Sequence, residues 1–153
     1  MGIVMVSILV AGLAGGIIVS VGHAQDTPLP NKLVIVAPDA AVPPQVSGFS
    51  GKWTGSWEGM LDSALIVTKI YPAQKGGWRA DVVYSWGTNY SWRIREPGYR
   101  EFDADFKDGA LVIQSGSLLT IKYRLSDDGK TLEGLYNAHR GDYKGIFQRA
   151  ADK

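Results

Sequence analysis

The sequence predicts an all-β domain, in which an antiparallel up-and-down meander closes into a barrel of about eight strands. From residue 49 onward, short runs of β-branched and aromatic residues alternate with Gly and Asp turn signals at close spacing. The segments 107–109 and 127–130 each carry an Asp-Gly pair, which permits tight hairpins between neighbouring strands. Turns this short leave no crossover for a parallel sheet. Closure into a barrel would also remove the two exposed sheet edges.

The first 24 residues form a separate apolar segment. They contain no Asp, Glu, Lys or Arg, and the apolar run 3–21 approaches the roughly 20 residues that span a bilayer. Gly22 and Ala24 are small residues placed three and one positions before a cut, and polar Gln25 follows. We therefore expect residues 1–24 to be a signal peptide cleaved after Ala24. An uncleaved membrane anchor is the alternative, because no basic residue precedes the apolar run. Both place the rest of the chain outside the cytoplasm, in the periplasm or secreted.

Residues 25–48 differ from the rest in composition, because they hold five of the seven prolines. Proline fixes φ and donates no backbone hydrogen bond, so the segment predicts an extended Pro-rich tether. Its one apolar run, Leu33–Ala37, is either an edge strand on the domain or part of a disordered linker. The barrel domain is then expected at 49–150, with a short tail at 151–153.

Nine runs within the domain have the composition of strands, and none has convincing helical periodicity. They are Lys52–Glu58, Ala64–Tyr71, Arg79–Trp86, Tyr90–Ile94, Tyr99–Phe106, Ala110–Gln114, Leu118–Leu125, Thr131–Asn137 and Asp142–Arg149.

Alternation within these runs indicates which faces are buried. Along Leu118–Leu125, Ile121 and Tyr123 share the apolar face, while Lys122 and Arg124 share the solvated face. The run Ala64–Tyr71 is apolar on both faces. We therefore expect its outer face to be covered by the tether or by a partner.

Composition sets aside several classes of function. The chain has 16 Lys and Arg against 15 Asp and Glu, a formal net charge of +1, and the two signs are interleaved. A nucleic-acid partner is not expected, because such binders show a basic stripe with a strong field. The chain has no cysteine, which excludes disulfides, thiolate metal sites and a cysteine nucleophile. The oligomeric state cannot be derived from these features.

No catalytic or metal-binding constellation is visible in the sequence. His139 lies in a predicted turn, where a solvated side chain is expected rather than a base oriented by Asp142. A Gly-x-Ser-x-Gly elbow and a paired-histidine motif do not occur. Asp103, Asp105 and Asp108 lack the spacing of a calcium loop. We expect no enzyme, no metal site and no cofactor, and keep an isomerase or cyclase as a third possibility after two kinds of binding module.

Aromatic residues concentrate between residues 78 and 99. Tyr84 and Trp86 share one strand parity, and Tyr90 and Trp92 share another. Tyr and Trp combine an apolar body with a hydrogen-bonding tip, which suits a barrel mouth that binds a hydrophobic, aromatic or sugar-like ligand. Ordinary core filling is the alternative. The sequence therefore predicts Tyr84, Trp86, Tyr90 and Trp92 as the ligand-binding residues of a small-molecule carrier.

Gly51-Lys52-Trp53 opens the first strand, and Arg149 ends the last. This pattern resembles the lipocalin and wider calycin pattern, in which a Trp near the start of the first strand closes one barrel end and an Arg packs across it. The resemblance implies that Gly51, Trp53 and Arg149 are structural closure residues, with a cation–π contact of about 0.5 to 2 kcal/mol. The stretch 51–149 also looks like uncharacterised exported domains of proteobacteria, some of them joined to hydrolases, a likeness that implies no activity.

Two other families are similar in part. Avidins share the Ile-Val-Thr run of residues 66–68, but residues 142–149 do not match their late Trp-rich strand, so biotin binding is not expected. Periplasmic inhibitors of metalloproteases pair a secreted barrel with a flexible N-terminal trunk, and residues 25–48 resemble that trunk, although the disulfide of that family is absent here. The alternative function is therefore a periplasmic protein-interaction or enzyme-inhibitor module that uses the tether.

Overall fold

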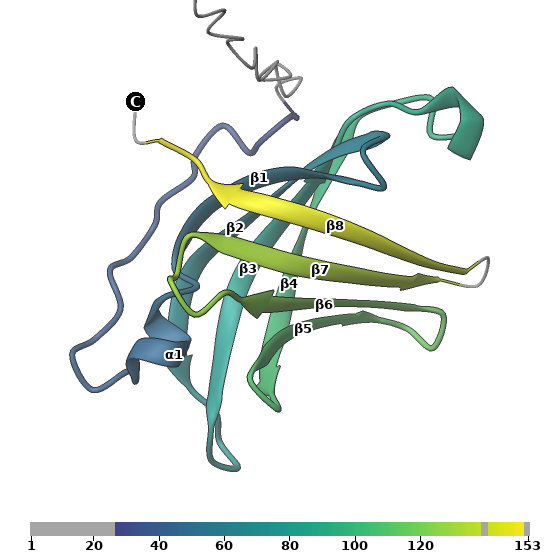
Figure 1. The fold of residues 1–153 in the computed structure, drawn as a ribbon. Coiled ribbons are helices and arrows are strands. Elements are labelled where there is room, and N and C mark those ends of the chain that lie inside the picture. Colours follow the sequence, from purple (N-terminus) through teal and green to yellow (C-terminus); the bar gives the residue numbers. More distant parts are fainter. Residues whose placement is uncertain (1–26, 139–140, 152–153) are drawn as a thin grey trace, which may run out of the picture.

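A computed structural model describes residues 27–138 and 141–151, so the predicted leader and His139 lie outside the described residues. Within them, eight antiparallel strands follow one another around a closed barrel, and the first strand pairs with the last (Figure 1). The predicted all-β meander that closes into a barrel is thereby confirmed. The strands are β1 (Gly51–Trp57), β2 (Leu61–Pro72), β3 (Trp78–Trp86), β4 (Gly98–Lys107), β5 (Ala110–Ser115), β6 (Leu119–Leu125), β7 (Thr131–Ala138) and β8 (Gly141–Arg149).

The Asp-Gly turns form hairpins where the sequence predicts them. Between β4 and β5, Asp108 and Gly109 both have positive φ, at 50° and 71°, which Asp and Gly tolerate better than other residues. Between β6 and β7, the Asp128 carboxylate accepts hydrogen bonds from Ser126 Oγ at 2.7 Å and from the Lys130 amide at 3.0 Å. These local bonds fix the turns and with them the register of the neighbouring strands.

The predicted strand Tyr90–Ile94 is wrong, which leaves eight strands. Tyr90–Trp92 forms a short 3-10 helix, η1, and only a single bridge joins Asn89 to Ile94. The Asn89 side chain accepts a hydrogen bond from the Trp92 amide at 3.0 Å, and Arg93 ends the turn with φ at 62°. A side chain that bonds its own backbone competes with strand pairing, so aromatic composition alone was misleading here.

The tether lies along the outside of the barrel. The Ser85 hydroxyl donates to the carbonyl of Pro28 at 2.7 Å, and the Val36 amide donates to the carbonyl of Thr68 at 2.7 Å. Leu33–Ala37 forms no strand, although it runs beside β2. Two tether residues, Leu29 and Leu33, pack on a small cluster of outward-facing residues made of Ala64, Ile66 and Val83. The tether therefore covers the outer face of β2, which explains why this strand is apolar on both faces.

The core fills the inside of the barrel. The predicted inward face of β6 is confirmed, because Ile121 and Tyr123 are fully buried while Lys122 and Arg124 are exposed. The one α-helix of the described residues, α1 (Pro44–Ser47), lies at one end of the barrel, and η1 lies at the other (Figure 1). In this part of the chain, no helix has the length and apolar character needed to cross a membrane. The two ends are therefore covered by different segments.

Candidate functional site

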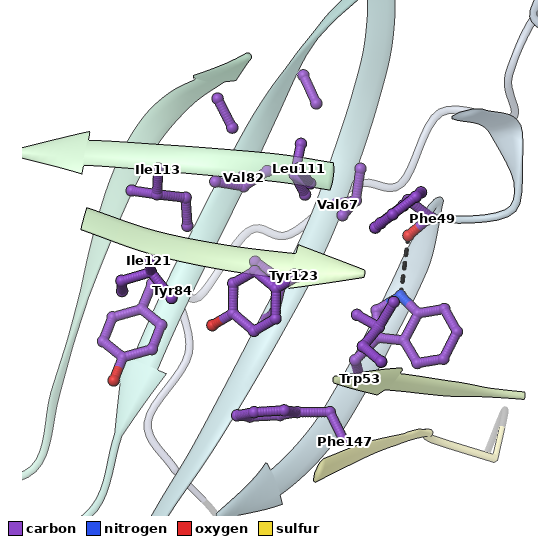
Figure 2. Close-up of a cluster of buried hydrophobic side chains, with 14 of the residues drawn as sticks. Phe49, Trp53, Val67, Val82, Tyr84, Leu111, Ile113, Ile121, Tyr123 and Phe147 are labelled. Atoms are coloured by element: carbon purple, nitrogen blue, oxygen red, sulfur yellow. Dashed lines mark hydrogen bonds between the residues drawn. The ribbon is translucent and has the colours of Figure 1, made fainter. Parts of the chain in front are cut away.

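The end of the barrel next to α1 is sealed by side chains that satisfy one another. Phe49 and Trp53 are buried, and the indole Nε1 of Trp53 donates to the carbonyl of Phe49 at 2.8 Å (Figure 2). The Arg149 guanidinium lies 4.2 Å from the centre of the Trp53 ring and donates to the carbonyls of Ser50, at 2.7 Å, and Gly48, at 2.6 Å. The structure thus brings the sequence-predicted pair Trp53 and Arg149 into direct contact.

Gly51 lies at the same end, where the backbone requires glycine. Its φ is 112°, a region that other residues rarely adopt. A Cβ at this position would lie 3.0 Å from Nη1 of Arg149. The third sequence-predicted closure residue therefore gives the arginine room to reach the two carbonyls.

The opposite end carries a group of aromatic side chains from four strands and η1. Tyr84 and Trp86 stack with ring centres 5.8 Å apart. Trp57 and Tyr136 are 5.5 Å apart, and Tyr136 and Tyr143 are 6.1 Å apart. The Trp92 ring lies 4.6 Å from Tyr143, so η1 reaches across to β8. We call this set the aromatic cluster: Trp57, Tyr84, Trp86, Trp92, Tyr136 and Tyr143.

Glycines on the facing strands position two of these rings. A Cβ on Gly98 would lie 2.6 Å from the Trp86 indole, and Gly98 is the strand partner of Trp86. A Cβ on Gly134 or Gly145 would lie 2.7 Å or 2.8 Å from the Trp57 indole. Glycine at these positions therefore lets the two indoles approach the backbone closely.

The structure unites three of the four sequence-predicted ligand residues. Tyr84, Trp86 and Trp92 belong to the aromatic cluster, whereas Tyr90 is 77% exposed and makes no contact with it among the described ring contacts. Sequence reasoning missed Trp57, Tyr136 and Tyr143. Two signals could have found them: Trp57 shares the inward parity of Trp53, and Tyr136 and Tyr143 are direct partners in the β7–β8 ladder.

The buried members of the aromatic cluster share a small set of polar groups inside the barrel. The Trp57 indole donates to the Tyr84 hydroxyl at 2.9 Å, and Ser63 Oγ lies 3.5 Å from the same hydroxyl. Tyr123 is fully buried, and its hydroxyl has no hydrogen-bond partner among the described residues. Figure 2 shows the hydroxyls of Tyr84 and Tyr123 both pointing away from Trp53.

Burial raises the pKa of three tyrosines of this region, Tyr84, Tyr123 and Tyr136, so these three are neutral at physiological pH. Burial raises the pKa of Tyr84 to about 12. Burial, followed by the neighbouring Tyr84 and Tyr136, raises the pKa of the Tyr123 hydroxyl well above its usual value. Burial and Tyr143 likewise raise the pKa of Tyr136. Of the described residues, no Asp, Glu, Lys or Arg is buried. The site thus presents neutral donors and ring faces rather than charge.

Two carboxylates of the failed calcium-loop pattern, and the one beside His139 in the sequence, have other partners. Asp105 binds Arg79 Nε at 2.9 Å, and Asp103 lies 3.9 Å from the same guanidinium on the outer face of the barrel. Asp142 accepts a hydrogen bond from the Asn137 side chain. Across the described parts of the chain, no group of three or more His, Cys, Asp or Glu side chains is placed to hold a metal ion.

The number and order of the strands are consistent with a lipocalin-like barrel. Comparison of the sequence with known proteins finds no family model and no curated protein that matches it. The sealed end and the aromatic cluster are therefore the observations from which a function is inferred.

Proposed function

We propose that this chain is an exported, non-catalytic binding module of the lipocalin-like kind, which carries a small hydrophobic, aromatic or sugar-like ligand at the aromatic end of its barrel. The observation that carries the proposal is the difference between the two ends. One end is sealed by Phe49, Trp53 and Arg149, whose polar atoms are satisfied by neighbouring carbonyls. The other end gathers six aromatic rings from elements far apart in the sequence.

The exposure of these rings supports a binding role. Trp86, Trp92, Tyr136 and Tyr143 are only partly buried, whereas Trp53 at the sealed end is fully buried. Partly exposed ring faces at the end of a barrel can stack on a flat ligand, and each such aromatic pair contributes about 0.5–1.5 kcal/mol beyond area burial. Hydrophobic and aromatic side chains are also the predominant lining of small-molecule sites in proteins.

Ligand titration with tryptophan fluorescence tests this proposal. The panel contains a naphthalene derivative, a long-chain alcohol and a disaccharide. We expect at least one compound to quench the fluorescence saturably, and Trp86→Ala to weaken its binding at least about tenfold, the loss of roughly 1.4 kcal/mol. Trp78→Ala is the matched control, because Trp78 lies at the other end of β3 and is also partly buried. Equal binding by wild type and by Trp86→Ala, or no binding at all, would contradict the proposal.

A second candidate function is a periplasmic protein-interaction or inhibitor module that uses the tether. The observation that favours it is a run of exposed apolar side chains, in which Val34 is 72%, Ile35 43% and Val36 48% exposed. A groove between tether and barrel adjoins this run, and its lining includes Lys32, Leu33, Asp81, Val83 and Glu101. Val34→Asp should abolish binding of a defined protein partner and leave ligand binding at the aromatic cluster unchanged. A partner that binds Val34→Asp with wild-type affinity would remove the tether from the interaction.

A further inference from the structure

Large apolar side chains are exposed at the aromatic end of the barrel. Met60, in the turn between β1 and β2, is 53% exposed, and Leu118, in the turn between β5 and β6, is 65% exposed. Tyr90 on η1 and Tyr99 near the start of β4 are exposed as well. Figure 1 shows η1 and these two turns at the end of the barrel opposite α1. All four side chains therefore lie at the same end as the aromatic cluster.

The turns at the sealed end have a different composition. They are the segments 73–77, 108–109 and 126–130, which join β2 to β3, β4 to β5 and β6 to β7. Apart from Ala73, they consist of Gly, Asp, Lys, Ser and Gln, and none of these three turns, all of which the structure describes, exposes a large hydrophobic side chain. Single exposed apolar residues are ordinary on protein surfaces, but a group of them at one end marks a site of interaction.

Two of the segments that carry these side chains are bonded to one another. Nδ2 of Asn89 donates to the carbonyl of Met60 at 2.9 Å, which holds η1 beside the turn between β1 and β2. The side-chain oxygen of the same Asn89 accepts from the Trp92 amide at 3.0 Å. Met60 and Tyr90 thus lie on backbone segments that are tied together. This lowers the conformational entropy that is lost when one partner buries both side chains.

The charges beside these side chains suit an anionic partner. The segment 87–100 contains one glutamate and three arginines, a formal charge of +2, and the three arginines are exposed: Arg93, Arg95 and Arg100. Two carboxylates at this end are engaged within the protein. Glu58 accepts a hydrogen bond from the Lys144 amide at 2.6 Å, and Asp142 accepts one from the Asn137 side chain. Exposed positive charge therefore adjoins the exposed tyrosines of the same segment.

We propose that the aromatic end of the barrel docks on the surface of an anionic lipid bilayer. Met60 and Leu118 enter the boundary between headgroups and acyl chains, and Tyr90 and Tyr99 lie at the level of the headgroups. The arginines of segment 87–100 contact lipid phosphates. A protein partner buries one well-packed patch, whereas these side chains stand on separate turns, an arrangement that a fluid lipid surface accommodates. The inference goes beyond the proposed function, because docking requires no ligand in the barrel.

A fluorescent label that brightens in lipid tests which end docks. The chain has no cysteine, so one introduced cysteine carries a nitrobenzoxadiazole label at a chosen position of the full chain. The label is placed at Met60→Cys, at Leu118→Cys and, as the matched control, at Gln74→Cys, an exposed position in a turn of the sealed end. Vesicles of phosphatidylcholine and phosphatidylglycerol in equal parts should raise the emission at 60 and 118 saturably and leave it unchanged at 74. Attachment through the apolar residues 1–24 alone would leave all three labels in water.

A charge at one apolar position measures what that position contributes. In the chain labelled at residue 60, Leu118→Asp should weaken vesicle binding at least about tenfold, because it removes a large apolar side chain from the lipid and adds a negative charge. Ile146→Asp is the control, because Ile146 is similarly exposed but lies within β8, away from the turns, and it should bind like the parent chain. Vesicles of phosphatidylcholine alone should bind the parent chain about tenfold more weakly than the mixed vesicles.

Several results would overturn the inference. An equal response of the labels at 74 and 118 would show that lipid binding is not confined to the aromatic end. No response at 60 and 118 would leave a protein as the partner of this surface, and a response without lipid that rises with protein concentration would assign the surface to a second copy of the chain. Wild-type binding by Leu118→Asp, or equal binding to both kinds of vesicle, would remove the apolar contact or the headgroup contact. The ligand titration of the proposed function is independent of all these results.

Discussion

The two ends of this barrel use the same kinds of side chain in different arrangements. At the sealed end, Trp53 has its nitrogen bonded to Phe49, and Arg149 covers its ring. At the aromatic end, Trp86 and Trp92 keep part of their surface exposed, and the hydroxyl of the buried Tyr123 has no hydrogen-bond partner among the described residues. Aromatic composition therefore does not distinguish the sealed end from the proposed binding site. The distinction lies in whether the polar atoms and ring faces already have partners in the protein.

Truncation of Trp53 at the sealed end should have the largest effect on the free energy of unfolding. Trp53→Ala removes a fully buried indole, and such changes cost about 3–5 kcal/mol. Trp86→Ala removes a partly exposed ring and should cost clearly less stability than Trp53→Ala. Urea unfolding of both variants checks this contrast. Equal losses would mean that the two ends are both structural plugs.

Alkaline pH should destabilise the barrel through its buried tyrosines. The folded-state pKa of Tyr84 is about 12 against 10.0 for the free side chain, because burial disfavours the phenolate. The contribution of this neutral group is therefore fully present below pH 10 and is lost as the pH rises from 10 toward 12. Tyr84 alone accounts for a loss on the order of 2–3 kcal/mol. Urea midpoints across this range should fall, and should fall less in Tyr84→Phe than in wild type. A flat profile would contradict the burial of the phenol.

Gly145, whose backbone lies close to the Trp57 ring, should not tolerate an added methyl group. In Gly145→Ala the new Cβ would meet the Trp57 and Phe147 rings at 2.8 Å, and overpacking of this kind costs about 1–3 kcal/mol. Gly87→Ala is the control, because its nearest contact would be an ordinary 3.5 Å and its φ is not in the left-handed region. Thermal unfolding distinguishes them. If both variants melt together, the Trp57 indole is not held against the β8 backbone.

Removal of two tyrosine hydroxyls in the same barrel should have different effects on the free energy of unfolding. Tyr84→Phe leaves the Trp57 indole nitrogen without its acceptor, and an orphaned buried donor costs about 1–2 kcal/mol. Tyr123→Phe removes a hydroxyl that has no partner in the described residues and should cost nothing. Urea unfolding of both variants beside wild type measures the difference. The reverse order would show that the hydrogen bonds of this region are wrongly assigned.

Most of the fold could be predicted from the sequence, because its determinants are local. The alternation along β6 separates Ile121 and Tyr123 from Lys122 and Arg124, and the Asp-Gly turns set short hairpins between neighbouring strands. The prediction of a strand after β3 was wrong, and the reason is again local. The Asn89 side chain caps a 3-10 turn there, and composition does not reveal such a bond.

The candidate site could be predicted only in part. The pairing of Tyr84 with Trp86 could be predicted, because these residues lie two positions apart on one strand. Trp57 and Tyr143 belong to the first and last strands, which meet only once the barrel closes. The parity of Tyr123 was predictable, but its missing partner depends on the side chains that surround it in three dimensions. Strand patterns in the sequence therefore could not predict the contacts that form when the first and last strands meet.

The indole N–H signals of the chain test the difference between the two ends most directly. The chain has five tryptophans, which lie at both ends of the barrel, so a two-dimensional nitrogen–proton NMR titration with a ligand from the fluorescence panel monitors both ends at once. We predict saturable shifts for Trp57, Trp86 and Trp92, and unchanged signals for Trp53 and Trp78. A shift of the Trp53 signal larger than those of the aromatic cluster, or no shift in any of the three, would contradict binding at the aromatic end.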